Sequence, residues 1–411
     1  MSETDQASHG MPSPTSKRRR RSPVHDLLDD TEEQTPRPKR TANHFDMHSL
    51  SSQSRSQSQS HSQTSGASSP RKRLATMELG PEGIEVRPLT EANRALPDSL
   101  MELIADMEQI KSGISVISSS LRDAITLQPR IRLREINFAE PATRDPLGPT
   151  PAVDTVREIV SAATYSEASL QTEHGWNCAV HYPLIQLALG IRRRDEAPLV
   201  DFTSCTSAKI IKEYLPGQTS SKMVDFCILL SPHNIAQSDS QVPPNTPTPA
   251  TFSRAAAAQA ANAIDALRAS LPCQSINHSD FGPLRRDPVA VSVETKRAGA
   301  GGEEARLQVG TWHAAQWKLL AGLVGDAGGD LAALPFLPAV IVTGHDWAFA
   351  CTTREGRRTI LWADCPFGST RSVLGVYSII YGIQYLARWS REIYLPWYLK
   401  NVLGLSSREE G

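Results

Sequence analysis

The apolar residues of this chain are concentrated in its C-terminal part, where their spacing predicts alternating strands and helices. Val-rich or alternating runs bounded by turn residues predict strands over 199–211, 222–230 and 289–296. Apolar residues three or four positions apart predict helices over 153–165, 167–189, 252–271, 303–324 and 372–389. Two further runs, at 339–352 and 359–365, predict a β-hairpin around Gly356. This order of elements predicts one mixed α/β domain over residues 152–405.

A regular apolar stripe precedes this domain. Apolar residues recur in steps of three and four from Leu100 to Ala124, which predicts an amphipathic helix over 97–128. The stripe has two interpretations: a coiled coil that forms a homodimer through 97–128, or a helix that docks on the folded domain. Gly113 and the serines at 118–120 weaken an isolated coiled coil, because both residue types lower helix propensity.

The N-terminal part of the chain has the composition of a disordered tail. Ser, Gln, His and Thr fill 49–69, and such a stretch cannot bury enough apolar surface to offset the entropy of ordering it. Basic clusters at 17–21 and 37–40 resemble a bipartite nuclear-import signal and predict a nuclear protein. The alternative is a solvated charge run that attracts nucleic acid weakly. The predicted organisation is a tail, a helical region, a linker, the α/β domain and a short C-terminal tail, over 1–89, 90–128, 129–151, 152–405 and 406–411.

Charge and cysteine content narrow the class of protein. The formal net charge is -1. Residues 1–75 hold twelve Lys or Arg against eight Asp or Glu, which gives +4 and leaves -5 for the remainder. This balance excludes a uniformly basic nucleic-acid binder. No apolar run reaches the ~18 residues that span a bilayer, so no membrane partner is expected. The six cysteines form no C-x-x-C pair, which is typical of reduced thiols in an intracellular protein.

One predicted strand carries an unusual pair of charges. The Val-rich run 289–296 ends with Glu294 and Lys296, which project to the same face because side chains alternate along a strand. Asp225 is a single acid in the apolar run 222–230, and burying it without compensation would cost several kcal/mol. On neighbouring strands, Asp225 and Glu294 would offer two hard oxygen ligands to Mg²⁺. Lys296 would orient water or offset charge on a phosphate.

Each of these residues also has a purely structural interpretation. Glu294 and Lys296 could form a same-face ion pair at the end of a strand, worth ~1 kcal/mol or less if exposed. Asp225 could instead accept a hydrogen bond from a backbone amide or pair with an arginine. The spacing alone, an acid followed 69 residues later by Glu-x-Lys (294 − 225), does not decide between these interpretations.

The sequence around these residues resembles that of the PD-(D/E)xK nuclease-like superfamily, and within it the fungal nuclease-like domain group. The segments that carry the resemblance are KMVD at 222–225, SINH at 275–278, VSVETKR at 291–297 and EARLQVGTW at 304–312. The chain departs from the family pattern at Val224, where the family has a proline that is not a ligand. The resemblance covers roughly 150–405 and implies a mixed central β-sheet flanked by helices, as in restriction endonucleases.

The resemblance also implies residue roles. Asp225 and Glu294 become ligands of Mg²⁺ or Mn²⁺, Lys296 the catalytic lysine and Gln308 a helix residue that faces the site. Glu173 resembles an acidic residue that many members place near the metal; a solvated helical carboxylate is its structural alternative. Two functions follow from different classes: a metal-dependent nuclease that hydrolyses phosphodiester bonds of nucleic acid, DNA or RNA, or a catalytically inactive nuclease-like scaffold that acts in the nucleus.

Overall fold

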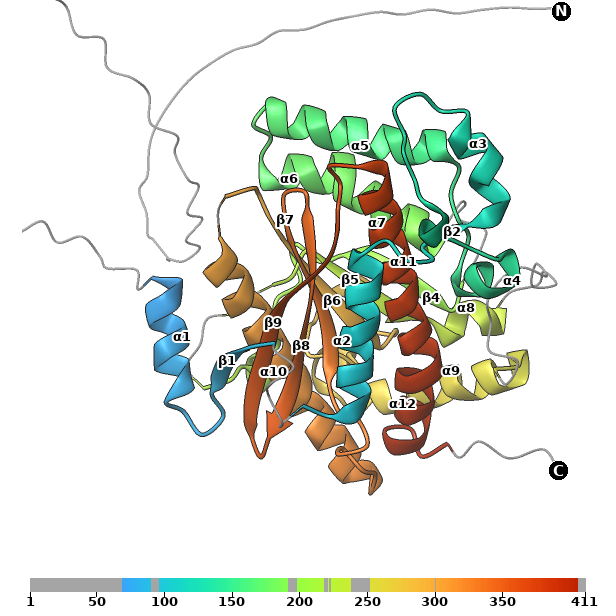
Figure 1. Cartoon of the computed structure of the whole chain (residues 1–411). Helices are drawn as coiled ribbons and strands as arrows, with labels where there is room; N and C mark the ends of the chain where they lie inside the picture. The colour runs from blue at the N-terminus through green and yellow to red at the C-terminus, as the bar shows by residue number, and fades with distance from the viewer. Residues whose placement is uncertain are drawn as a thin grey trace, which may run out of the picture. The chain divides into compact units, whose positions relative to one another are not determined.

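A seven-stranded β-sheet forms the centre of the protein, with helices on both of its faces (Figure 1). The computed structural model describes residues 69–89, 96–190, 198–217, 221, 223–237, 252–299 and 301–405. The strands lie in the order β1–β9–β8–β7–β6–β5–β4. Their bounds are Ile84–Pro88 (β1), Val200–Ser204 (β4), Phe226–Leu230 (β5), Val289–Lys296 (β6), Leu337–Thr343 (β7), Asp346–Glu355 (β8) and Arg358–Ser369 (β9). The β1–β9 and β6–β7 pairs are parallel and the others antiparallel, so the expected mixed sheet is confirmed.

Strand β6 lies inside the sheet and begins and ends where the sequence predicts. All of its residues are buried, because helices cover both faces and β5 and β7 cover both edges. Such burial on two faces explains why the strand is a nearly continuous apolar run until its last residues. The polar end of β6, from Glu294 to Lys296, is therefore buried as well.

Two helical layers enclose the sheet. Helix α10 (Gly302–Ala327) packs against β1, β6, β7 and β9, whereas α2 (Asp98–Lys111) and α11 (Val373–Trp389) pack on the other face of β9. Figure 1 shows α2 and α11 in front of the strands and α10 behind them. The remaining helices of eight or more residues are α1 (Pro70–Glu78), α5 (Val153–Ala168), α7 (Tyr182–Leu189) and α9 (Arg254–Arg268).

The helix expected over 97–128 is shorter than the apolar stripe indicates. Helix α2 ends at Lys111, and Gly113 follows with a φ of 71° that a helix does not accommodate. The next residues form β2 (Ile117–Ser118), which pairs with β3 (Phe138–Ala139), and the short helices α3 (Arg122–Thr126) and α4 (Pro141–Arg144). The apolar face of α2 is buried in the core, which corresponds to the docked alternative rather than the coiled coil.

The ordered domain also begins earlier than expected. Helix α1 and strand β1 lie within 1–89, the region expected to be a tail, and β1 pairs with β9 from Ile84 to Pro88. The side chain of Ile84 is buried against α10, which explains why so short a segment joins the sheet. The basic clusters at 17–21 and 37–40 and the tail 406–411 lie outside the described residues.

Turns place several strand boundaries at positions that differ from those predicted from the apolar runs. The run 339–352 is two strands, because Gly344 adopts a φ of 57° and turns β7 back into β8. The predicted hairpin around Gly356 is confirmed between β8 and β9, and Gly356 has a φ of 62°. The run 199–211 is a strand only over β4, and the run 222–230 only over β5.

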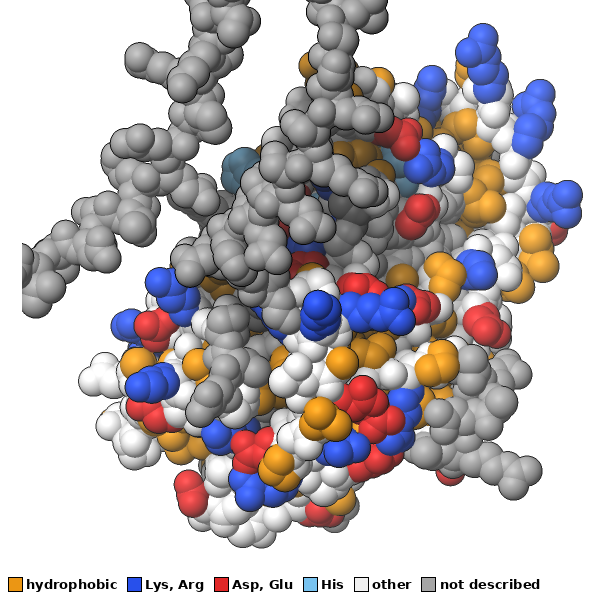
Figure 2. Space-filling model, turned by 90° about the vertical axis from the view of Figure 1, so that its left-hand side faces the viewer, with side chains coloured by type: hydrophobic (Ala, Val, Ile, Leu, Met, Phe, Trp, Pro, Cys, Tyr) orange, Lys and Arg blue, Asp and Glu red, His pale blue; other side chains and the backbone are white. Residues whose placement is uncertain are grey.

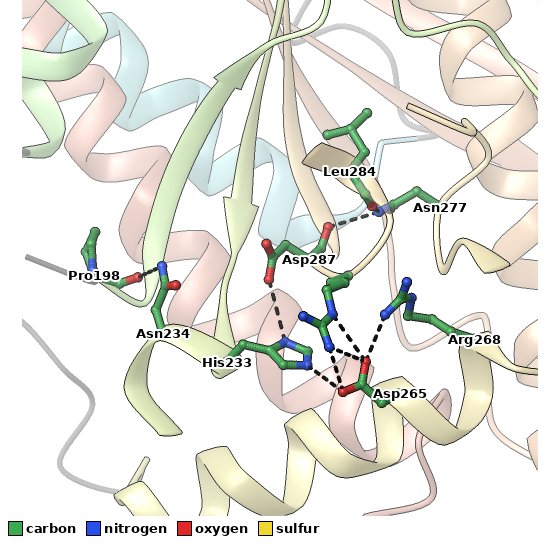
Figure 3. Close-up of polar contacts among 9 residues, drawn as sticks. Pro198, His233, Asn234, Asp265, Arg268, Asn277, Leu284 and Asp287 are labelled. Carbon is green, nitrogen blue, oxygen red and sulfur yellow. Dashed lines mark hydrogen bonds and ion pairs between the residues drawn. The ribbon is translucent and has the colours of Figure 1, made fainter. Parts of the chain in front are cut away.

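A cluster of charged residues fixes the end of the sheet where β5 finishes and β6 begins (Figure 3). Asp265 of α9 accepts hydrogen bonds from Arg268 at 2.9 Å and Arg286 at 3.1 Å, and its Oδ2 lies 3.3 Å from Nε2 of His233. Nδ1 of His233 lies 3.9 Å from Oδ1 of Asp287. Asn277 holds the same loop, since its amide donates to Asp287 O at 2.9 Å. These contacts join α8 (Pro232–Gln237), α9 and the loop that enters β6.

The carboxyl of Asp287 gives this cluster a pH dependence. Burial raises the pKa of Asp287 to about 6, against about 4 for an exposed aspartate. Between these values the folded protein binds more protons than the unfolded chain, so ionisation of Asp287 lowers the free energy of unfolding as pH rises from about 4 to above 6. We expect Asp287→Asn to remove this loss, which is ~3 kcal/mol at most.

Urea unfolding followed by tryptophan fluorescence at pH 4, 5.5 and 7.5 measures the effect. The stability of Asp287→Asn relative to the unsubstituted protein should rise with pH. The exposed Asp280 supplies a matched control, and Asp280→Asn should leave the pH profile as it is. Parallel pH profiles for Asp287→Asn and the unsubstituted protein would contradict this account.

Candidate functional site

Glu294 and Lys296 lie on one face of β6 and form a buried ion pair. Glu294 is completely buried and Lys296 nearly so, and Nζ of Lys296 donates a hydrogen bond to Oε1 of Glu294. The same ammonium donates to the carbonyl of Thr295 at 2.8 Å. It also lies 3.4 Å from both carboxylate oxygens of Glu173, at the start of α6 (Glu173–Trp176). The structure therefore brings three of the predicted residues together at the end of β6.

Asp225 lies immediately before β5 rather than inside it. Its N–H donates to Val293 O at 3.0 Å, and its Oδ2 accepts from both the N–H and the hydroxyl of Thr295 at 2.8 Å. Thr295 projects to the face of β6 opposite Glu294, because side chains alternate. The Asp225 carboxylate is thus held by Thr295, the neighbour of Glu294 on β6. The hydrogen bond from the Thr295 N–H agrees with the structural interpretation of Asp225, in which its carboxylate accepts from a backbone amide.

The charges of these residues still act on one another. Burial raises the pKa of Glu294 well above its ordinary value, and the negative charge of Asp225 raises it further, despite the opposing effect of Lys296. Burial also raises the pKa of Glu173. Burial would lower the pKa of Lys296, but the charge and hydrogen bond of Glu294 raise it overall. Two carboxyl groups contact one ammonium and the charge of Asp225 acts on the same group, which makes this end of β6 favourable for an additional cation.

Three residues that the sequence did not single out hold Asp225 in place. Nδ2 of Asn177 donates to Oδ1 of Asp225 at 3.1 Å, and Oδ1 of Asn177 accepts from the Thr295 hydroxyl at 2.8 Å. Nδ1 of His181 lies 2.9 Å from the same Asn177 oxygen, and its Nε2 lies 3.1 Å from Gly344 O. Burial lowers the pKa of His181 to about 4, so at pH 7 the ring is neutral and has one N–H for two acceptors.

A local helix irregularity creates this arrangement. Residues Asn177–His181 form one turn of π-helix between α6 and α7, where the sequence predicted a helix over 167–189 with a break near Pro183. A π turn inserts a residue into a helix and is frequent at functional sites. It directs both Asn177 and His181 at the sheet. The only signal in the sequence is their spacing of four on a predicted helix, which many buried helices share.

Gln308 supports the site from α10. Its Nε2 donates to Met223 O at 3.1 Å, two residues before Asp225. The contact fixes the segment that leads into β5. The structure therefore places Gln308 against the backbone beside the carboxylates, and its predicted catalytic role stays a prediction.

The oxygen atoms at the end of β6 suit a hard divalent cation. Oε2 of Glu294 is buried and has no hydrogen-bond partner among the described residues, and the Asp225 oxygens retain lone pairs. Within residues 69–405, as far as they are described, no three His, Cys, Asp or Glu side chains gather around a common metal position. Glu294 and Asp225 are the residues that could supply one or two carboxylates to Mg²⁺ or Mn²⁺, which keep several waters when bound to protein.

The surface of the domain carries both signs of charge. On the face shown in Figure 2, Lys and Arg side chains mix with Asp and Glu over the lower half, and Lys and Arg are more frequent at the upper right. This mixture agrees with the exclusion of a uniformly basic nucleic-acid binder. Across the described part of the chain, the helices are all too short or too polar to span a bilayer.

Comparison with known proteins gives one match. The family model described as the PD-(D/E)XK nuclease superfamily matches residues 124–395, a range that includes all five predicted site residues. Searches of the curated proteins and of the solved structures found no match. The fungal nuclease-like group stays a prediction.

The network around Asp225 gives a testable prediction for stability. Asn177→Ala would leave Oδ1 of Asp225 and one nitrogen of His181 buried without their partner. We expect it to lower the free energy of unfolding by ~1–3 kcal/mol at pH 7, as is usual for unpaired buried polar groups. Urea titration measures this loss. Asn234→Ala is the matched control, because the side chain of Asn234 donates one hydrogen bond, to Pro198 O at 3.2 Å, away from the site (Figure 3). Equal losses in the two variants would contradict the network.

Proposed function

Because the chain belongs to the PD-(D/E)XK nuclease superfamily, we propose that it is a metal-dependent nuclease that hydrolyses phosphodiester bonds of nucleic acid. The observation that supports this most directly is the cluster at the end of β6, where the buried Glu294 and Lys296 meet the partly exposed Glu173, with Asp225 at the adjacent end of β5. An ordinary structural ion pair does not need a second and third carboxyl group beside one ammonium. Excess negative charge in a buried site is instead typical of cation binding.

We assign the metal to Glu294 and Asp225, with Glu173 at the edge of the site. Oε2 of Glu294 has no other partner among the described residues, and β6 fixes the carboxylate from both sides. Asn177 and Thr295 orient the Asp225 carboxylate by three hydrogen bonds. When bound, a divalent cation polarises a phosphoryl oxygen and lowers the pKa of bound water. The rigid strand and the π turn supply the positioning that this chemistry requires.

Lys296 acts in this proposal as a fixed positive charge. Its pKa is raised, so the amine is protonated at neutral pH and donates hydrogen bonds rather than removing a proton. The ammonium is suited to orient a water molecule or to offset charge that develops on a phosphate oxygen. In the structure it compensates Glu294 and Glu173, and therefore occupies the part of the site where a cation is most favourable.

One observation favours the alternative, a catalytically inactive nuclease-like interaction protein. Asp225 and Glu294 both have protein partners, Thr295 and Lys296, which already compensate part of their charge. A scaffold requires no further compensation of these charges. Metal affinity therefore separates the two functions.

Calorimetric titration of Mn²⁺ into the full-length protein, followed by incubation with mixed DNA and RNA, tests the proposal. We expect Glu294→Gln to lose Mn²⁺ binding by at least about tenfold and to lose cleavage, because it removes a buried ligand charge. Lys296→Met removes the competing cation, so it should bind Mn²⁺ as tightly as the unsubstituted protein or more tightly, yet fail to cleave.

The exposed Glu303 on α10 provides the control. Glu303→Gln should bind and cleave normally. Cleavage that persists in Glu294→Gln would refute the assigned site. An unsubstituted protein that binds no Mn²⁺ would favour the scaffold.

We also propose that the protein acts in the nucleus. The support is the pair of basic clusters at 17–21 and 37–40, which lie outside the described residues. Replacing the Lys and Arg of both clusters by Gln in a fluorescent fusion should abolish nuclear accumulation. The same replacement at Arg71, Lys72 and Arg73 of α1 is the control and should leave it intact. Unchanged accumulation in the first variant would disprove import through these clusters.

A further inference from the structure

A charged cavity lies away from the carboxylates. It has a volume of about 140 Å³ and is formed by α10, the end of the β8–β9 hairpin and the segment before β1. Trp317 and Ala314 of α10 line its apolar part, and Arg354, Lys318 and Arg357 are its basic side chains. Glu82 is the acidic residue among those that line it. The volume is sufficient for several water molecules or for one tetrahedral oxyanion.

Arg354 stands out because its charge has no partner. The side chain is about half buried, its Nε is fully enclosed, and it makes no hydrogen bond or ion pair with any described residue. Burial lowers the pKa of Arg354, since desolvation is not offset by an acid. A partly buried guanidinium normally has a carboxylate or carbonyl partner. Its free donors are therefore an unexplained feature of this cavity.

The nearby carboxylates are already engaged by other arginines. Arg87 pairs with both Glu85 and Glu355, Arg358 with Glu85, and Arg357 with Glu82. No acid remains for Arg354 among the described residues that line the cavity. With Lys318 exposed at the rim, the cavity has three cationic side chains against one carboxylate.

The cavity is also built to hold a planar or tetrahedral anion rigidly. Trp317 is almost completely buried, and its indole N–H donates to the hydroxyl of Thr352 at 2.9 Å, which fixes the ring. The apolar wall formed by Trp317 and Ala314 lowers the local polarity and so strengthens a charge interaction with the guanidinium. The guanidinium presents its donors in a fork that matches two oxygens of one phosphate.

We propose that this cavity binds a phosphate group, with Arg354 as its principal ligand. Gly301, the residue before α10, lies beside Lys296, and Lys318 is 16 residues beyond Gly302, the first residue of α10 (318 − 302), or ~24 Å along the helix. The cavity is thus separate from the carboxylates. A backbone phosphate bound here would be ~7 nucleotides from a scissile one at 3.4 Å per nucleotide. This use as a nucleic-acid anchor rests on the proposed nuclease function, whereas a free phosphorylated molecule requires only the cavity.

The first test uses inorganic phosphate. Thermal unfolding of the full-length protein is measured with increasing phosphate, and with chloride at matched ionic strength. We expect phosphate to raise the Tm of the unsubstituted protein and of Arg157→Met, an exposed arginine of α5 that serves as the control. Arg354→Met keeps the aliphatic stem and should show no shift specific to phosphate. Its own Tm should be unchanged or higher, because an uncompensated charge is removed.

The second test uses a labelled 20-nucleotide strand, followed by fluorescence anisotropy in the Glu294→Gln background with EDTA, so that no cleavage occurs. If the cavity anchors nucleic acid, Arg354→Met should weaken binding about tenfold and reduce the salt slope by ~0.7. Arg157→Met should change the affinity less than about twofold.

The outcomes distinguish nucleic acid from a free phosphorylated molecule as the source of the phosphate. They also distinguish failure of the phosphate site from failure of the proposed nuclease function. A phosphate-specific Tm shift lost in Arg354→Met, with unchanged strand affinity, assigns the cavity to a free phosphorylated molecule. The same shift in a protein that binds no strand would keep the cavity and count against the nuclease. Equal Tm shifts with phosphate and chloride, together with equal strand affinity in Arg354→Met and Arg157→Met, would overturn the phosphate site.

Discussion

The ion pair between Glu294 and Lys296 is buried at the end of an interior strand, and a buried pair is stable only when each charge is fully compensated. The neighbourhood of β6 is arranged around this requirement. Glu173 and the carbonyl of Thr295 complete the contacts of the ammonium, while α10 and the loop before β5 close the site from the side. The position of α6, the π turn and the entry to β5 all depend on the charges at this one strand end.

This dependence links stability and chemistry. Burial and the charge of Asp225 keep Glu294 poised toward its neutral form, and Lys296 opposes them. A cation bound between the carboxylates would relieve the same repulsion that Lys296 now limits. A bound cation and the ammonium of Lys296 would therefore compete for the same negative charge. This arrangement lowers the free energy of unfolding and gives the site affinity for cations.

The sequence predicted the parts of the fold that depend on local pattern. Strand β6 was predictable because it is buried on both faces, and α10 because its apolar positions recur over many turns.

Among the site residues, the shared face of Glu294 and Lys296 followed directly from strand alternation. Asp225 was identified correctly as a residue near them, but its orientation was not, because it depends on Thr295 and Asn177 from other segments. The spacing of Asn177 and His181 on a predicted helix was too common a signal to identify them, since a π turn is fixed by tertiary contacts rather than by local preference. The apolar stripe at 97–128 was misleading because it joins α2 to residues that pack separately after Gly113.

The parallel pairing of β1 with β9 has a consequence for how the chain folds. Ile84 pairs with Thr359, so one edge of the sheet joins residues 275 positions apart (359 − 84). At ~5–20 residues per second, a ribosome needs roughly 15–55 seconds to synthesise the intervening chain. Until then β1 has no strand to join, and afterwards closing so long a loop is slow. Completion of this edge is therefore a late event in biosynthesis, and the nascent chain depends on its central strands for order before that point.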